Sequence, residues 1–380
     1  MRTIQQYYAG NQWHELNHST NIDSAACQLV LVFGSGELVT RQDLFSHIRS
    51  QYPNAEIVSC STAGEILDDT VFDKTLSVTA IQFEKTRVRT TAVQVNRNSS
   101  SLETGRSLMK QLDTDELVSI FVLSESSFIN GGELVRGFNE NNPRQIPVTG
   151  GLAGDAERFQ KTQVGLNAAA TEGKVVAIGL YSRHLLVAHS SFGGWEEFGR
   201  ERIITRSENN ILYEIDNRNA LDLYKEYLGP YAEELPGAAL FFPLSMQVEH
   251  QGYSLVRTIL SINEENKSMI FAGNLPEGSK VHLMKANFDK IIHASSEAAT
   301  SVLATGVKKT PELSILVSCV GRKRILQERT AEEIKAARKA LGPESAITGF
   351  YSYGEIAPFG QQTHCELHNQ TMTITTFTEL

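Results

Sequence analysis

The sequence lacks most features that assign a chain to a specialised class. Its four cysteines, Cys27, Cys60, Cys319 and Cys365, form no C-x-x-C pair, which excludes a zinc knuckle and a disulfide framework. No run approaches the roughly 18 consecutive apolar residues of a membrane span, and residues 1–20 lack the apolar core of a signal peptide. We therefore expect reduced thiols, a cytoplasmic location and no insertion into a membrane.

Positive charge is also scarce. The chain has 35 Lys and Arg against 44 Asp and Glu, a net charge of −9, and no basic stripe offsets this balance. Because contacts to nucleic-acid phosphates need clustered Lys and Arg, nucleic acid is not expected as a partner.

The chain is long and apolar enough for two domains. It has 380 residues, of which 41% are hydrophobic, whereas single cores tend to stop growing at about 250–300 residues. We expect an N-terminal extension over 1–22, a first domain over 23–205 and a second over 206–380. The boundary is placed there because a new pattern begins nearby, with a helix at 220–228 closed by Gly229 and Pro230.

A strand–helix–strand unit is repeated along the chain. Its copies begin at the apolar runs 29–33, 117–123 and 313–319. They end in turns with a Gly-acid pair, at Gly64-Glu65, Gly154-Asp155 and Gly354-Glu355, where Asp155 replaces the Glu of the outer copies. Short apolar strands separated by amphipathic helices indicate buried parallel strands, and we expect the three turns to occupy equivalent positions.

Alternating segments follow each turn. They are found at 75–83 with 88–95, at 175–181 with 185–191, and at 371–377. Alternation indicates antiparallel hairpins. The predicted fold class is therefore α/β, with repeated strand–helix–strand units forming layered sheets with antiparallel hairpins.

Catalytic motifs are incomplete. The turn at 34–36 (GSG) has neither a third Gly nor a Lys for phosphates, Cys60 has no local His partner, and His364 and Cys365 would point to opposite faces of a strand. A non-enzymatic protein is favoured, and an enzyme using Cys60 or the Glu65 and Glu355 turns is the less favoured alternative.

Two stretches are typical of pocket lining. His189 ends an alternating strand before Gly193, Gly194 and Trp195, and an aromatic turn at 350–355 ends a buried strand. Open α/β sheets bind ligands at such edges. We predict a cavity where Arg257 and Glu355 would complement a carboxylate and an amine. The predicted ligand-binding residues are Tyr351, Tyr353, Glu355, Arg257, His368 and Trp195. The alternative is that these are ordinary packing residues.

Four segments resemble the motifs of the FIST sensory proteins, whose name stands for F-box and intracellular signal transduction. They are residues 59–66 (SCSTAGEI), 193–195 (GGW), 349–358 (GFYSYGEIAP) and 368–373 (HNQTMT). The likeness covers residues 23–380 and implies two fused halves, one of the FIST N type and one of the FIST C type. It further implies a ligand-binding input module for signal transduction, with amino acids as candidate small-molecule ligands.

The resemblance also implies a candidate cofactor and partner. Many FIST members are fused to output domains, and none follows Leu380 in this sequence, so the expected likeness is to the stand-alone bacterial members. These include nitric-oxide-sensing haem proteins that act in trans on a histidine kinase of a two-component system. A homodimer is left open.

Haem, if bound, would be held non-covalently by an axial His, since no C-x-x-C-H motif is present. His189 is the predicted axial ligand because it lies beside the Gly-Gly-Trp turn, where a flat ligand can approach backbone. His250 is the second choice. The alternative is a sensor of a small amino-acid-like ligand without haem.

Overall fold

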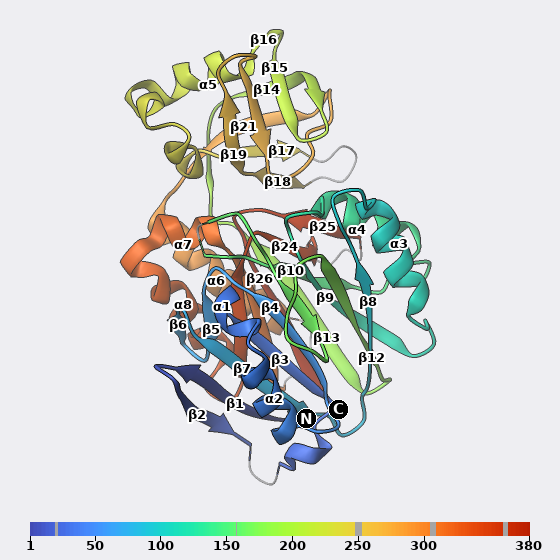
Figure 1. Ribbon diagram of the computed structural model, residues 1–380. Helices are drawn as coiled ribbons and strands as arrows, with labels where there is room; N and C mark the ends of the chain where they lie inside the picture. Colours follow the sequence, from blue (N-terminus) through green and yellow to red (C-terminus); the bar gives the residue numbers. More distant parts are fainter. Residues whose placement is uncertain (20–21, 157, 248–252, 305–308, 360–363) are drawn as a thin grey trace.

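The computed structural model describes residues 1–19, 22–156, 158–247, 253–304, 309–359 and 364–380. It is a mixed α/β protein with two parts (Figure 1). We call the described residues of 1–194 and 287–380 the three-sheet body, and those of 195–286 the insert. The insert lies over one end of the body (Figure 1). The α/β class and the repeated strand–helix–strand units are confirmed.

The three sheets of the body share one strand pattern. The first has the order β11 (Val164–Leu166), β4 (Glu56–Ser61), β3 (Leu29–Gly34), β7 (Leu76–Gln82), β1 (Arg2–Ala9) and β2 (Gln12–His18). The second has the order β25 (Cys365–His368), β24 (Gly354–Pro358), β10 (Val148–Leu152), β9 (Leu117–Ser124), β12 (Lys174–Tyr181) and β8 (Arg87–Gln94). The third has the order β6 (Thr70–Phe72), β5 (Glu65–Leu67), β23 (Ala346–Ser352), β22 (Leu313–Cys319), β26 (Met372–Glu379) and β13 (Leu185–Phe192).

Each sheet is built around a parallel pair, namely β3 with β4, β9 with β10, and β22 with β23. An antiparallel strand, β7, β12 or β26, pairs with the first member of each pair. The three units therefore have equivalent topology, as the sequence repeat predicts.

The units also exchange strands in a ring. β5 follows β4 in the chain but pairs with β23 of the third sheet. β24 follows β23 but pairs with β10 of the second sheet, and β11 follows β10 but pairs with β4 of the first. Each unit thus completes a neighbouring sheet, so no unit has a complete sheet of its own.

The inner faces of the three sheets meet in one core. It contains Phe33 from the first sheet, Phe121 from the second, and Ile315, Phe350 and Phe377 from the third. Helices cover the outer faces: α2 (Gln42–Gln51) packs on the first sheet, α3 (Ser101–Gln111) and α4 (Gly131–Glu140) on the second, and α6 (Phe288–Leu303) and α8 (Thr330–Leu341) on the third. Because both faces are buried, the central strands are continuously apolar.

Shorter helices connect these elements. They are η1 (Ser24–Ala26), α1 (Gly36–Val39), α7 (Val320–Leu326) and η4 (Gln327–Arg329). No helix among the described residues is long and apolar enough to cross a membrane.

The insert has an antiparallel sheet and its own core. The strand order is β18 (Ser254–Arg257), β17 (Leu244–Gln247), β21 (Lys280–Lys285), β14 (Glu196–Glu208), β15 (Ile211–Ile215), β20 (Ser268–Phe271) and β19 (Ile259–Asn263), and β16 (Arg218–Asn219) pairs with β15. Against it pack α5 (Ala220–Leu228), η2 (Gly229–Glu234) and η3 (Gly237–Phe241). Leu212, Tyr224, Met269 and Phe271 lie at the centre of this core.

The predicted domain limits can be placed on this architecture. Residues 2–18, which fall in the predicted N-terminal extension, form β1 and β2 of the first sheet. The predicted boundary at 205/206 falls within β14, a strand of the insert. The division of the chain into functional domains stays a prediction.

Candidate functional site

The strand-ending turns of the three units contact one another in a ring. Ala63 N–H donates to Tyr351 O (2.8 Å), Tyr353 N–H to Leu152 O (3.2 Å), and Gly154 N–H to Ser61 O (2.9 Å). These bonds are equivalent under the threefold repeat. They bring the three turns together at one end of the parallel strands, which is where α/β sheets form ligand sites.

Glu65 and Glu355 occupy equivalent positions in this ring. Glu65 accepts hydrogen bonds from Thr62 Oγ1 (2.5 Å) and from the N–H and Oγ1 of Thr75 (3.2 and 2.6 Å). Glu355 accepts from Ser352 Oγ (2.7 Å) and from the N–H and Oγ1 of Thr371 (3.1 and 2.9 Å). Burial raises the pKa of both carboxyls to about 7. Through these hydrogen bonds, each carboxyl joins one strand end to the next.

Asp155 is not equivalent to these glutamates, which corrects the predicted match for the middle unit. In the first and third units, Ile66 pairs with Gly349 and Ile356 pairs with Gly150. In the middle unit, the residue at the corresponding position of the strand pairing is Gly165, which lies opposite Ser59. Val164 rather than Asp155 therefore occupies the glutamate position. The reason is the longer segment between β10 and β11, in which Asp155 has a different function.

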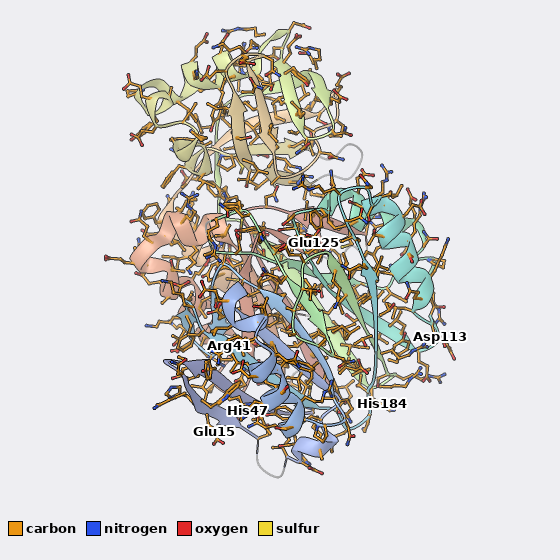
Figure 2. The ribbon with its side chains drawn as sticks, viewed as in Figure 1. Glu15, Arg41, His47, Asp113, Glu125 and His184 are labelled. Carbon is orange, nitrogen blue, oxygen red and sulfur yellow. The ribbon has the colours of Figure 1, made fainter. Side chains whose placement is uncertain are left out.

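The Asp155 carboxylate holds the loop that follows it. It accepts hydrogen bonds from the backbone N–H groups of Phe159 (2.8 Å), Gln160 (3.1 Å) and Lys161 (3.0 Å), and from the hydroxyl of Tyr353. A second buried carboxylate, Glu125, lies at the end of the body that faces the insert (Figure 2).

Glu125 holds the neighbouring loop in the same way. It accepts from the N–H groups of Ser127 (2.9 Å) and Phe128 (2.8 Å), and burial raises its pKa. Two loops beside each other are thus fixed by buried acids.

These loops form one wall of a pocket of about 740 Å³ between the body and the insert. The body contributes Arg97, Ser126, Ser127, Phe128, Ile129, Asn130, Gly131, Leu152, Phe159, Gln160, Lys161, Glu172 and Tyr353, and the insert contributes Asn210, Leu260, Phe271, Ala272 and Gly273. The volume is within the range of sites for small molecules.

The pocket has charged groups and an aromatic platform. Its charged lining residues are Arg97, Lys161 and Glu172, and Lys161 Nζ lies 3.5 Å from Glu172 Oε1. The ring of Phe159 stacks on Tyr353, with centroids 4.3 Å apart and an interplanar angle of 15°. The lining can therefore contact both a charged group and an apolar ring.

Polar contacts between described residues join the insert to the body beside this pocket. The buried Arg257 guanidinium donates from Nη1 to Leu367 O (3.1 Å), and burial lowers its pKa to about 10. Tyr253 OH donates to Glu366 Oε1 (2.9 Å). Asn274 Oδ1 accepts from Asn130 Nδ2 (3.3 Å), which caps α4. The pocket wall on the insert is continuous with this interface, since Gly273 precedes Asn274.

The six predicted ligand-binding residues do not all meet in this pocket. Of them, Tyr353 alone is among its described lining residues. The buried Tyr351 hydroxyl donates to Glu333 Oε1 (2.6 Å), and Trp195 Nε1 donates to Gln370 O (3.0 Å). The structure instead brings Arg257, Glu355 and His368 to the β24–β25 hairpin, where Glu355 pairs with His368. Burial lowers the pKa of His368 to about 4.

The residues that the sequence interpretation missed are Arg97, Phe128, Phe159, Lys161 and the pocket wall of the insert. An acid just after each predicted parallel strand, Glu125 and Asp155, was the available signal. The carboxylate of such an acid can accept hydrogen bonds from the backbone N–H groups of a functional loop. The residues from the insert have no comparable signal.

The described lining of the pocket lacks the usual axial ligands of haem. It contains no His, Cys or Met to bind iron, and the hydroxyl of its one Tyr, Tyr353, already donates to Asp155. His189 lies elsewhere, half-buried on β13, with its Nδ1 lacking a hydrogen-bond partner in the described structure. Burial lowers its pKa, so the imidazole is neutral at pH 7. His250 lies outside the described residues. The pocket residues therefore do not fit haem, and His189 as a ligand stays a prediction.

The other candidates for reactive chemistry are the four cysteines and any group of metal-binding side chains. All four cysteines are buried, and burial raises the pKa of each thiol, which disfavours the thiolate form that a nucleophile at Cys60 would need. Across the described part of the chain, no three His, Cys, Asp or Glu side chains are grouped to hold a metal ion.

Comparison with known proteins identifies the family. Residues 28–218 match the FIST N domain and residues 220–358 match the FIST C domain. These matches cover most of the chain, which therefore belongs to the FIST family. FIST domains are sensory domains that bind ligands in signal transduction, rather than catalytic domains.

No curated protein matches the chain. Among solved structures, cyanuric acid hydrolase from A. caulinodans is similar, with a TM-score of 0.36 and 6% identity over 94% of this chain and 91% of that chain. A likeness at this level carries no functional inference.

Proposed function

We propose that this protein is a ligand-responsive sensor whose ligand binds between the three-sheet body and the insert. The observation that carries the proposal is the pocket of about 740 Å³, lined by loops of the body on one side and by residues of β19, β20 and Ala272-Gly273 on the other. A ligand that contacts both parts stabilises the arrangement in which they lie closest.

The connections between the two parts permit a hinge. The chain crosses between them twice, at Gly193–Trp195 and at Ala286–Asn287, and these crossings adjoin the paired strands β14 and β21. Gly194 has φ of +76°, and an added Cβ would lie 2.4 Å from Lys290 O. When two parts of a protein close around a ligand, a few hinge residues between them change their backbone dihedral angles. Coupling of about 1–3 kcal/mol is enough for signalling.

The charges favour an amino-acid-like ligand. Arg97 and Lys161 would contact its carboxylate, and Glu172 its amine. This assignment replaces Arg257 and Glu355 as the predicted pair, because the groups of these two residues already bond to Leu367 O and to Ser352 and Thr371 within the protein.

The output is proposed to act in trans. A FIST sensor of this type would be cytoplasmic and would change its affinity for a separate signalling protein, of which a histidine kinase is the candidate implied by the family resemblance. The protein itself would catalyse no reaction.

Haem-based sensing of nitric oxide is the second candidate function, and the unpartnered Nδ1 of His189 favours it. Its test is the absorption spectrum after titration with haem. A Soret band that His189→Ala removes, while the circular dichroism spectrum is unchanged, would support it. An unchanged band in His189→Ala, or no band in the wild-type protein, would remove it.

The main proposal is tested by ligand binding and by distance. The twenty amino acids are screened by thermal unfolding against the wild-type protein and against Ala272→Trp, which places an indole in the pocket. Spin labels at Lys110→Cys on α3 and Glu233→Cys on η2 report the distance between the body and the insert, and the buried native cysteines label slowly.

We expect at least one amino acid to raise the unfolding temperature of the wild-type protein but not of Ala272→Trp, and to narrow the distance distribution between the labels. The same rise in both proteins would place the ligand elsewhere. A bound ligand that leaves the distance distribution unchanged would contradict the hinge.

A further inference from the structure

We propose that the natural ligand carries a planar aromatic ring together with an acidic group. This inference rests on the proposed function and specifies the chemical class that the same pocket selects. Two separate sets of residues support it, one for the ring and one for the acid.

The ring is selected by Phe159. This side chain is 47% exposed although it is large and apolar, and its backbone has φ of +53°, a conformation that is rare for a bulky residue. Such strain persists only where the surrounding structure enforces it. Here Asp155 enforces it through hydrogen bonds to the N–H groups of Phe159, Gln160 and Lys161.

One face of the Phe159 ring is occupied and the residue remains exposed. Tyr353 stacks beneath it, and the hydroxyl of Tyr353 donates to the Asp155 carboxylate, so both rings are held by the same acid. Phe128 and Phe271 also line the pocket. A planar ring stacked on Phe159 would extend the existing pair, because aromatic rings prefer offset stacking at such distances.

The acid is selected by charge. The protein carries a net charge of −9, yet two of the three charged residues that line the pocket are cations, Arg97 and Lys161. Arg97 forms no ion pair or hydrogen bond with the described residues, and the contact of Lys161 with Glu172 is long, at 3.5 Å. A carboxylate is therefore favoured over a neutral group.

The test uses three small probes of similar size. Phenylacetate has both features, cyclohexylacetate keeps the charge without the planar ring, and phenylacetamide keeps the ring without the charge. Binding is measured by saturation-transfer NMR and calorimetry. We expect phenylacetate to bind about 5-fold tighter than either of the others, since stacking and an exposed ion pair each contribute modestly.

Two variants assign these preferences to residues. Phe159→Leu should weaken phenylacetate binding about 5-fold while leaving cyclohexylacetate unchanged, because only the stacking partner is lost. Lys161→Gln should reduce the preference for phenylacetate over phenylacetamide, and Arg97→Gln/Lys161→Gln should bring the two probes to similar affinities. The matched controls are Tyr231→Leu, an exposed aromatic of the insert, and Lys110→Gln, an exposed cation of α3, and neither should change binding.

The outcomes separate this inference from the proposed function. Equal affinities for phenylacetate and cyclohexylacetate, or a Phe159→Leu protein with unchanged preference, would overturn the aromatic acid. If an amino acid or cyclohexylacetate still binds and Ala272→Trp abolishes that binding, the pocket remains a ligand site. If no probe binds in a way that depends on Ala272, the inference and the proposed site both fail.

Discussion

The three-sheet body and the insert bury their apolar side chains in different ways. In the body, three units share one core and exchange strands in a ring, so that Leu67 pairs with Thr348. In the insert, a single antiparallel sheet packs on α5 and forms a separate core. Its strands β19 and β20 are consecutive in the chain and pair with each other. The body is therefore one interlocked unit, and the insert is a separately packed one.

The largest expected effect is on the close approach of strands in the body. Gly349 has φ of +156°, and an added Cβ would lie 1.8 Å from Leu316 O on the neighbouring strand. Gly349→Ala should lower the free energy of unfolding by more than about 3 kcal/mol, because neither backbone can yield in a buried sheet. Urea unfolding followed by circular dichroism measures this change.

A glycine of the insert provides the control. Gly278 has φ of +84°, but an added Cβ would meet no atom within 4 Å. Gly278→Ala should cost only about 1–2 kcal/mol, from the backbone conformation alone. Equal effects of the two substitutions would contradict the view that the body is the more tightly constrained part.

The second effect concerns buried charge. Arg322 and Glu333 form an ion pair in which both side chains have 0% exposure, with an N–O distance of 2.7 Å. Arg322→Met leaves the carboxylate buried without its partner and should cost about 3–5 kcal/mol. The insert pair of Arg202 and Asp216 is more exposed, and Asp216→Asn should cost about 1 kcal/mol or less.

The free energy of unfolding of Arg322→Met is then compared with that of the double variant Arg322→Met/Glu333→Leu. The double variant should recover part of the lost stability, since it removes the unpaired charge. A double variant less stable than Arg322→Met alone would show that packing, rather than charge, dominates at this site.

The third effect is the pH dependence of the body. The folded-state pKa of Glu65 and of Glu355 is raised from 4.5 to about 7. Their stabilisation is fully present below about pH 4.5 and is lost as the pH rises through about 7, on the order of 3 kcal/mol for each carboxyl. In the double variant Glu65→Gln/Glu355→Gln, the free energy of unfolding should depend much less on pH over this window.

The matched substitution in the insert is Glu264→Gln. Glu264 is exposed, and its hydrogen bonds to Lys225 and Lys267 lower its pKa, so its titration lies below this window. Glu264→Gln should leave the pH dependence of the unfolding free energy between pH 4.5 and 7 unchanged. A profile that stays steep in the double variant would assign the pH dependence to other groups.

The smallest effect is expected where the body meets the insert. Tyr253→Phe removes the hydrogen bond to Glu366 and should cost about 1 kcal/mol. It should also broaden the distance distribution between labels at Lys110→Cys and Glu233→Cys. Tyr231→Phe, on the exposed surface of the insert, should change neither quantity. A broadened distribution in Tyr231→Phe as well would mean that the labels do not report this interface.

Much of the fold could be predicted from local patterns, but the site could not. The apolar runs at 29–33, 117–123 and 313–319 gave three correctly placed strands because continuous burial leaves a clear pattern. The equivalence of Glu65 and Glu355 was also readable. Asp155 was misassigned because an acid after a Gly can equally cap a loop, and only the strand register distinguishes the two.

By itself the sequence determined the class of this protein. Its repeated strands and its turn motifs are local properties, since each depends on residues close together in the chain. Only the tertiary structure decided which sheet each exchanged strand completes, and that Phe159 and Lys161 face Ala272 across a pocket. Contacts between residues more than a hundred positions apart depend on how whole surfaces pack, and no local pattern encodes them.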